Sequence, residues 1–171
     1  MKVILWGTLV ANGNFAQISE GNPVHQAAFS DFAARAQAAG NFIVGRKTFE
    51  VFAASGAEAD SMGKIDIVLV SQSIKEIPGV KVVRSPQEAL AYLQARGHTT
   101  TILAGGAALL SAFLSQGLVD QLVLNVVPAL EGKGLNILLD QERYQYKEVK
   151  LLDVQSLDKD IVQLHYAVDR A

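Results

Sequence analysis

The alternation of strand-like and helix-like patterns constrains the fold of this chain more than any other feature of its sequence. Short apolar runs rich in strand formers occur at residues 2–9, 42–44, 65–70, 80–83 and 99–104. Helical patterns lie between most of these runs, whereas the chain from residue 121 onwards contains strand-like runs alone. This order predicts an α/β fold: a central, mainly parallel mixed sheet flanked by helices, with an antiparallel C-terminal hairpin.

The helices are predicted from residue spacing and from capping residues. Between Pro23 and Gly40 one helical face recurs at three- and four-residue steps, and it comprises His25, Phe29, Phe32, Ala33 and Ala36. A capping box at residues 85–88 opens a second helix. Residues 107–116 form a third helix, and residues 47–52 begin a shorter one. Two strand-like runs at residues 144–152 and 161–168 predict the hairpin.

Composition narrows the classes of protein and of partner. The length of 171 residues suits one domain, so residues 1–171 are expected to form a single domain without a linker or repeat. A net charge of −2 lacks the basic excess of a nucleic-acid binder, which favours a small-molecule partner. No apolar run approaches the roughly 20 residues that span a bilayer. The absence of cysteine excludes a disulfide scaffold and thiolate metal sites but does not fix the compartment. A cytoplasmic location is the default expectation.

Three strand ends carry the residues that best suit an anionic ligand. They are Val44 followed by Gly45-Arg46-Lys47-Thr48, Val70 followed by Ser71-Gln72-Ser73, and Leu103 followed by Ala104-Gly105-Gly106. Ligands of open α/β sheets lie beyond the carboxyl ends of the strands, where helix N-termini and free backbone N–H groups converge. The three ends together suit a phosphorylated dinucleotide, although each alone is a weak signal. The alternative is that the glycines form a tight turn and that Arg46 and Lys47 are ordinary solvated charges.

The other titratable residues give weaker signals. The histidines His25, His98 and His165 are scattered without a paired ligand, so no metal site is expected. His25 lies on the predicted apolar face, where a satisfied core histidine is the main alternative to a ligand contact. Asp31 has Arg35 four residues later, which favours a solvent-side ion pair over a catalytic acid.

Four stretches resemble the dihydrofolate reductase superfold, and specifically the family of the C-terminal reductase domain of the bifunctional riboflavin-biosynthesis deaminase/reductase. "LVANGNFA" resembles the family's first strand and loop, and "IVGRKTFE" resembles the Gly-Arg-x-Thr stretch used on the NADPH phosphates. "LVSQS" resembles the segment that receives the adenosine 2′-phosphate. "ILAGGAALLSAFLSQGLVDQLVLNVVPALEGKG" carries the family's glycine turn, helix, Gly-Leu-Val-Asp, strand and second glycine turn in order.

The resemblance implies NADPH as cofactor and assigns its contacts residue by residue. It implies that Gly45, Arg46 and Thr48 meet the phosphates and that Ser71 and Gln72 lie near the adenosine ribose. It places Gly105, Gly106 and Ala107 against the pyrophosphate, and Thr8 and Ala16 toward the nicotinamide. Related reductases have a non-proline cis peptide in the glycine turn, which makes Ala104-Gly105 and Gly105-Gly106 the candidates for one here.

Two departures from the related enzymes bear on activity. The chain has no cysteine, whereas the zinc deaminase of the bifunctional members requires an H-x-E and P-C-x-x-C signature. Dihydrofolate reductases also place a carboxylate on the first helix, and ungapped counting back from Gly45 reaches Phe29 instead. Asp31 is reached only with a two-residue shift.

The leading hypothesis is an NADPH-dependent reductase, similar to 5-amino-6-(5-phosphoribosylamino)uracil reductase. It would pass hydride directly to a small heterocyclic substrate, a pyrimidine ribosylamine or a pterin-like ring. The substrate is expected between Trp6 on the first strand and His25 and Phe29 on the first helix. The alternatives are a catalytically silent nucleotide-binding homodimer of the same fold, motivated by Phe29, and dihydrofolate reductase proper. The region from residue 121 resembles the family's dimerising part, so an isologous homodimer is expected.

Overall fold

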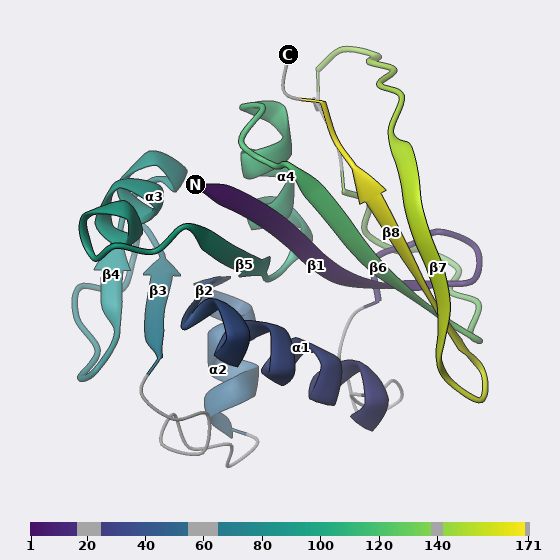
Figure 1. Cartoon of the computed structure of the whole chain (residues 1–171), viewed down its shortest axis with the longest axis horizontal. Coiled ribbons are helices and arrows are strands. Elements are labelled where there is room, and N and C mark those ends of the chain that lie inside the picture. The colour runs from purple at the N-terminus through teal and green to yellow at the C-terminus, as the bar shows by residue number, and fades with distance from the viewer. Residues whose placement is uncertain (17–24, 55–64, 138–141, 170–171) are drawn as a thin grey trace.

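The computed structural model describes residues 1–16, 25–54, 65–137 and 142–169. Eight strands form one sheet in the order β4-β3-β2-β5-β1-β6-β8-β7 (Figure 1). In chain order they are β1 (Lys2–Val10), β2 (Asn41–Gly45), β3 (Asp66–Val70), β4 (Lys81–Val83), β5 (Thr100–Ala104), β6 (Gln121–Val127), β7 (Lys150–Asp158) and β8 (Ile161–Ala167). The first six pair in parallel, whereas β8 pairs antiparallel with β6 and β7 antiparallel with β8. The predicted mainly parallel mixed sheet with an antiparallel end is confirmed.

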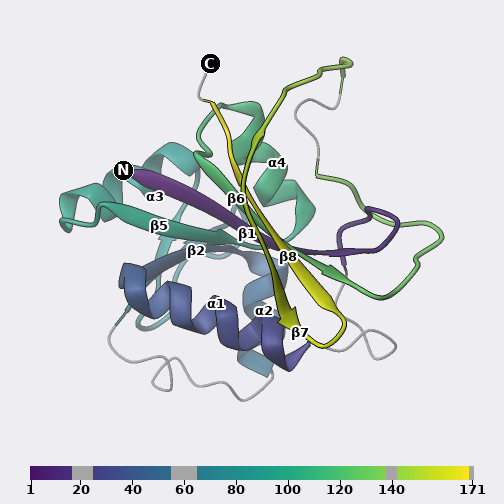
Figure 2. The ribbon, with the colours of Figure 1, turned by 45° about the vertical axis from the view of Figure 1, so that its right-hand side comes forward.

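The helices cover the two faces of the sheet (Figure 2). Helices α1 (Gln26–Ala39) and α2 (Arg46–Ala54) lie on one face, and α3 (Pro86–Ala95) and α4 (Ala107–Ser115) lie on the other. Successive residues of β1 supply both cores, because side chains along a strand point to alternate faces. Among the described residues, no helix is long and apolar enough to cross a membrane.

The start of α1 differs from the prediction. His25 has extended angles and occupies the N-cap position, so it precedes the helix and does not lie on its apolar face. The buried side of the helix is formed by Ala28, Phe32 and Ala36, with Phe29 only half-buried beside them. Gly40 ends the helix in the left-handed conformation, as its position predicted. Pro23 lies outside the described residues.

The C-terminal hairpin forms around the predicted turn but with a later first strand. β7 begins at Lys150, opposite Ala167 of β8, and runs to Asp158. The predicted strand at 144–152 was therefore wrong at both ends. Tyr144 and Tyr146 are exposed, because β8 ends at Ala167 and offers them no pairing partner.

Candidate cofactor and substrate site

The three strand ends predicted from the sequence lie together at the carboxyl ends of the parallel strands. β2 lies between β3 and β5, and all three strands run in the same direction. Gly45 pairs with Val70 at the end of β3. On the other side, the backbone nitrogen of Gly45 lies 3.3 Å from the point where a Cβ on residue 105 would be. Residues 45, 71 and 105 thus meet at neighbouring corners of the fold.

Two helix N-termini open onto this edge. α2 begins at Arg46, directly after the last residue of β2. α4 begins at Ala107, and its N-cap residue Gly106 supplies no side-chain cap. The first N–H groups of a helix have no partner within the helix, and the helix dipole places partial positive charge there. Because β2 and β5 are neighbours, the two N-termini together favour an anion at this corner.

The two glycines before α4 differ in what surrounds them. A Cβ on Gly105 would meet Leu109 Cδ2 at 3.0 Å and the Gly45 nitrogen at 3.3 Å, so packing within the protein explains this glycine. A Cβ on Gly106 would meet nothing within 4 Å. The open backbone at Gly106 leaves room for a bound group such as a pyrophosphate. All described peptide bonds are trans, so the cis bond implied for the Ala104 to Gly106 turn is not found.

Arg46, the basic residue of this corner, forms an ion pair within α2. The Arg46 guanidinium donates to both carboxylate oxygens of Glu50, at 2.9 and 3.3 Å, and both side chains are exposed. An exposed pair four residues apart is weak, so Arg46 can exchange this partner for a phosphate. Thr48 lies half-buried in the same first turn of α2.

The turn after β3 is organised by Ser71 and by Arg84, and the sequence analysis missed Arg84. The buried Ser71 hydroxyl accepts from the N–H groups of Ser73 and Ile74, which closes the turn. Arg84, just after β4, donates to the Ser71 and Ile74 carbonyl oxygens, and its own carbonyl accepts from Gln72. The signal available in the sequence was the position of Arg84 directly after a strand-like run.

The loop after β1 folds back on that strand. The Ala16 N–H donates to the Thr8 carbonyl oxygen at 2.8 Å, and Leu9 forms an antiparallel bridge with Phe15. Asn12 fixes the loop to the segment after β6, because its amide exchanges hydrogen bonds with the Glu131 backbone at 2.8 and 3.1 Å. Thr8 and Ala16 are therefore adjacent, as a shared contact with one ligand requires.

The predicted substrate residues lie along a row of aromatic rings on the α1 and α2 side. The Trp6 ring packs on Phe32 with centroids 5.4 Å apart, and Phe32 packs on Phe42 at 5.3 Å. Phe42 contacts Phe52, which in turn contacts Phe29 at 6.2 Å. Trp6 and Phe29 thus belong to one aromatic row but are separated within it. His25 lies before α1, with its carbonyl oxygen accepting from Phe29.

Asp31 faces the sheet. The expected ion pair with Arg35 is present at 2.9 Å, but the Asp31 side chain is only 13% exposed, so the predicted solvent-side location was wrong. Its Oδ2 also accepts from the Trp6 indole Nε1 at 2.8 Å and from Gln163 at 2.9 Å. The reason is the strand β8, whose Gln163 lies close enough to α1 to bind Asp31.

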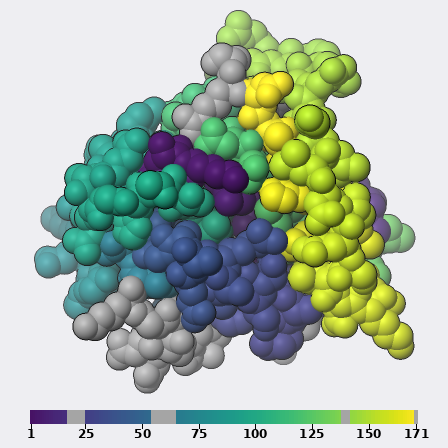
Figure 3. Space-filling model, viewed as in Figure 1, coloured from purple at the N-terminus to yellow at the C-terminus, as the bar shows by residue number. Residues whose placement is uncertain are grey.

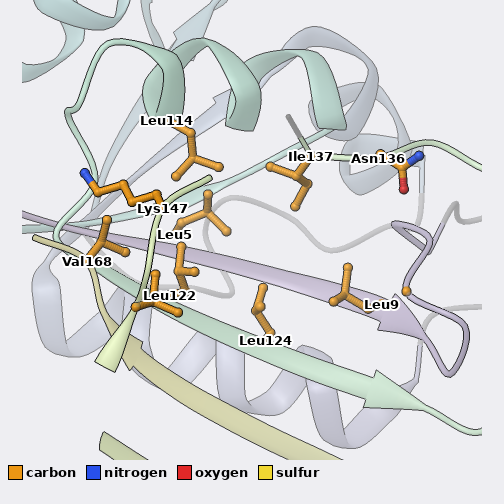
Figure 4. A pocket seen from close by; sticks show the side chains of 11 residues that line it. Leu5, Leu9, Leu114, Leu122, Leu124, Asn136, Ile137, Lys147 and Val168 are labelled. Atoms are coloured by element: carbon orange, nitrogen blue, oxygen red, sulfur yellow. The ribbon is translucent and has the colours of Figure 1, made fainter. Parts of the chain in front are cut away.

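An apolar cavity of about 280 Å³ lies on the opposite face of the sheet, between α4 and strands β1 and β6 (Figure 4). Leucine side chains such as Leu5, Leu114 and Leu124 form much of its lining. Lys147 and Val149 border it from the segment that leads to β7. The cavity belongs to the α4 face and is separate from the Trp6 side of the sheet.

Comparison with known proteins places this geometry in a family. The family model of the RibD C-terminal domain matches residues 10–163. A relative, the riboflavin biosynthesis protein RibD of Corynebacterium ammoniagenes, is 47% identical over 51 residues. That match covers 30% of this chain and 15% of the relative's length.

Solved structures share the fold over nearly the whole chain. A pyrimidine reductase-like protein of Corynebacterium diphtheriae matches with a TM-score of 0.77 and 16% identity, over 99% of this chain and 92% of its own. The diaminohydroxyphosphoribosylaminopyrimidine deaminase/5-amino-6-(5-phosphoribosylamino)uracil reductase of Thermotoga maritima matches with a TM-score of 0.70 and 13% identity. The match covers 98% of this chain and 56% of the Thermotoga maritima protein. At these identities the likeness establishes the fold.

Proposed function

The chain belongs to the RibD C-terminal domain family, and from this premise we propose that it is an NADPH-dependent reductase of a small heterocyclic substrate. The observation that carries the proposal is the corner where the N-termini of α2 and α4 open side by side next to the uncovered backbone of Gly106. A helix N-terminus with glycine backbone is a common binding place for the phosphates of a dinucleotide.

The residues at this corner fit NADPH. The N–H groups at Ala107 and the first turn of α2 would donate to phosphate oxygens, and Arg46 and Thr48 would add side-chain donors. The turn at Ser71 would receive the adenosine end. NADPH, when bound, supplies the hydride, and the protein supplies position and electrostatics. The adjacent Thr8 and Ala16, at the end of β1, would border the nicotinamide.

The proposed substrate is a flat ring, such as a pyrimidine ribosylamine or a pterin-like heterocycle. Trp6 and Phe29, the half-buried ends of the aromatic row, support a planar ligand, because aromatic side chains stack on flat rings. His25 adds a polar group before α1. The Thermotoga maritima relative carries a uracil reductase in its name, which supports a pyrimidine as the first compound to test.

One observation favours a silent nucleotide-binding protein as the second candidate. The Asp31 carboxylate already accepts from Trp6, Arg35 and Gln163, so these internal donors occupy it. The ungapped counterpart of the folate enzymes' carboxylate is Phe29, which packs on Phe52. Both features also count against dihydrofolate reductase proper, whose chemistry uses a carboxylate beside the pterin.

We further propose a homodimer formed by the outer face of β6, β8 and β7. Gln163 bonds to Asp31 and Arg35 of α1. Gln155 and Asn125 bond to Gln163 and so lie on the same face, and the sequence neighbours of all three point to the other face. That other face carries the exposed apolar residues Val154 and Val162, and it continues into the cavity through Leu122 and Leu124. Figure 3 shows β7 along the side of the molecule. An apolar face of this kind suits a second copy of the chain.

NADPH titration tests the proposed function. Trp6 is the sole tryptophan, so its emission should fall as NADPH binds at micromolar concentrations. Oxidation of NADPH is then followed with pyrimidine ribosylamines, pterins and aldehydes. Absence of NADPH binding at tens of micromolar would overturn the proposal. Binding without oxidation of NADPH by any compound would favour the silent protein, and strong inhibition by methotrexate-type antifolates would favour dihydrofolate reductase.

A further inference from the structure

The Trp6 side chain is held by a hydrogen bond as well as by packing. Its indole Nε1 donates to Asp31 Oδ2 at 2.8 Å. Packing on the tilted Phe32 ring, at 5.4 Å between centroids, limits where the indole lies but does not alone select its orientation. The second side-chain torsion of tryptophan has broad minima, so a bond to one edge of the ring is what fixes it.

Asp31 is itself held by Gln163, the buried centre of a polar network that reaches the surface at Gln155. We define the Gln163 network as Trp6, Asp31, Arg35, Asn125, Gln155 and Gln163. The Gln163 amide nitrogen donates to Asp31 at 2.9 Å and to Asn125 at 2.8 Å. Its carbonyl oxygen accepts from Arg35 at 2.8 Å and from Gln155 at 2.6 Å. Both donors and both acceptor positions of this amide are used, and the residue is 1% exposed.

The network joins elements from both ends of the chain. Asp31 and Arg35 lie on α1, Asn125 on β6, Gln155 on β7 and Gln163 on β8. One orientation of the Gln163 amide is favoured, because a flipped amide would set its oxygen against the Asp31 carboxylate and its NH2 group against the Arg35 guanidinium. The network therefore links β8 to the Trp6 ring through hydrogen bonds.

We propose that Gln163 and Asp31 are positioning residues that hold the Trp6 indole in one orientation on the substrate side of β1. The role in substrate binding rests on the proposed function, since it takes Trp6 as one wall of the substrate pocket. Neither residue has to touch the substrate or the cofactor in this role. Asp31 acts through the indole N–H, and Gln163 acts through Asp31.

Nuclear magnetic resonance of the ligand-free protein tests the positioning directly. Since Trp6 is the sole tryptophan, a labelled sample gives one indole N–H signal, and incorporation of 5-fluorotryptophan gives one fluorine signal. In wild type we expect one sharp fluorine line and slow exchange of the indole proton. In Asp31→Ala and Gln163→Met we expect exchange to accelerate by about tenfold or more and the fluorine line to broaden or split.

Two further variants separate positioning from general stability. Asp31→Asn keeps an acceptor for the indole and should preserve the single fluorine line. Asp66→Ala removes a carboxylate with two partners of its own at a distant site, so it should lower the melting temperature without changing the indole signals. Unchanged indole signals in both Asp31→Ala and Gln163→Met would overturn the proposal, as would equal changes in Asp66→Ala.

A kinetic measurement connects the positioning to function. With any substrate that wild type reduces, Gln163→Met should raise the KM for that substrate by about tenfold. Its dissociation constant for NADPH should stay within about twofold of wild type, because the network lies away from the phosphate corner. An unchanged KM would refute the role in substrate binding. A wild-type protein that neither binds nor oxidises NADPH would refute the proposed function, and the indole signals would still decide whether the network orients Trp6.

Discussion

The backbone nitrogen of Gly45 lies 3.3 Å from the position that a Cβ on residue 105 would occupy. Two strand ends that are distant in sequence are therefore in direct contact, and the Leu109 side chain packs over both glycines. Backbone and one leucine of α4 therefore hold together the corner proposed for the NADPH phosphates.

Gly105→Ala should destabilise the protein. The added methyl would approach Leu109 Cδ2 at 3.0 Å and the Gly45 backbone at 3.3 Å, and the backbone cannot give way as a side chain can. A loss of about 1–3 kcal/mol in the free energy of unfolding is expected from overpacking. Urea denaturation measures it, and a midpoint equal to that of wild type would contradict the packing seen at this corner.

Gly106→Ala should separate cofactor binding from stability. Its methyl meets no atom within 4 Å, so the free energy of unfolding should fall by no more than about 1 kcal/mol, the cost of alanine in place of glycine at a helix N-cap. The dissociation constant for NADPH should rise by about tenfold or more if the pyrophosphate lies against this residue. Calorimetric titration supplies the measurement. Unchanged affinity would place the pyrophosphate elsewhere.

Arg46→Met should weaken NADPH binding with little effect on folding. The Arg46 to Glu50 pair is exposed, and such pairs on helices contribute about 0.3–0.5 kcal/mol. Glu50→Gln is the matched control, because it removes the same ion pair but leaves the guanidinium available. We expect the dissociation constant to rise by about tenfold in Arg46→Met and to stay equal or fall in Glu50→Gln. Equal losses in both variants would show that the ion pair itself is what matters.

Asp66 should contribute stability that disappears in acid. Burial raises the pKa of Asp66, but hydrogen bonds from Arg96 and His98, each at 2.7 Å, and their charges lower it below its ordinary value. A carboxylate with a lowered pKa stabilises the fold above its unfolded pKa and loses that effect as pH falls through its folded pKa. Asp66→Asn should therefore cost about 1 kcal/mol at neutral pH, and the two stability curves should converge below about pH 4.

Chemical denaturation across this pH range measures the difference between wild type and Asp66→Asn. Asp160→Asn, in the exposed turn between β7 and β8, is the control and should stay within about 0.5 kcal/mol of wild type at every pH. A wild-type to Asp66→Asn difference that is constant with pH would contradict the lowered pKa.

Val154→Asp should dissociate the proposed homodimer. Val154 is 52% exposed on β7, on the apolar face shared with β6 and β8, and a charge there would be buried between two copies. Val51→Asp makes the same substitution at a 39% exposed residue of α2 and should leave the oligomeric state unchanged. Light scattering coupled to size exclusion gives the mass. A monomeric wild-type protein would refute the dimer.

Much of the fold was predictable because periodicity and caps act locally. The capping box at Ser85 and Glu88 opens α3 as predicted, with the Glu88 N–H donating to the Ser85 hydroxyl. The predicted bounds 144–152 were wrong, because the apolar character of a segment shows that it can pair but not where its partner strand ends. His25 has extended angles and caps α1, so helical spacing alone misplaced it on the face of the helix.

The site was predictable where it depends on strand ends and not where it depends on register. An apolar run followed by glycine identifies the end of a parallel strand, and that was sufficient for Gly45 and Gly105. The roles of Arg84 and Gln163 were not predicted, because their hydrogen-bond partners depend on which strands are neighbours and on how those strands align. In the sequence, Gln163 is one polar residue of a strand, and only the pairing with β6 brings it to Asn125 and Asp31.

The bond from Gln163 to Asp31 spans 132 positions of the sequence. During synthesis, α1 and the first strand leave the ribosome long before β8 is made, so Asp31 is present before the amide that binds it. A nascent chain halted before β8 would contain every residue of the proposed phosphate corner but would lack Gln163. Translation therefore delivers the proposed phosphate corner before the residue that completes the Gln163 network.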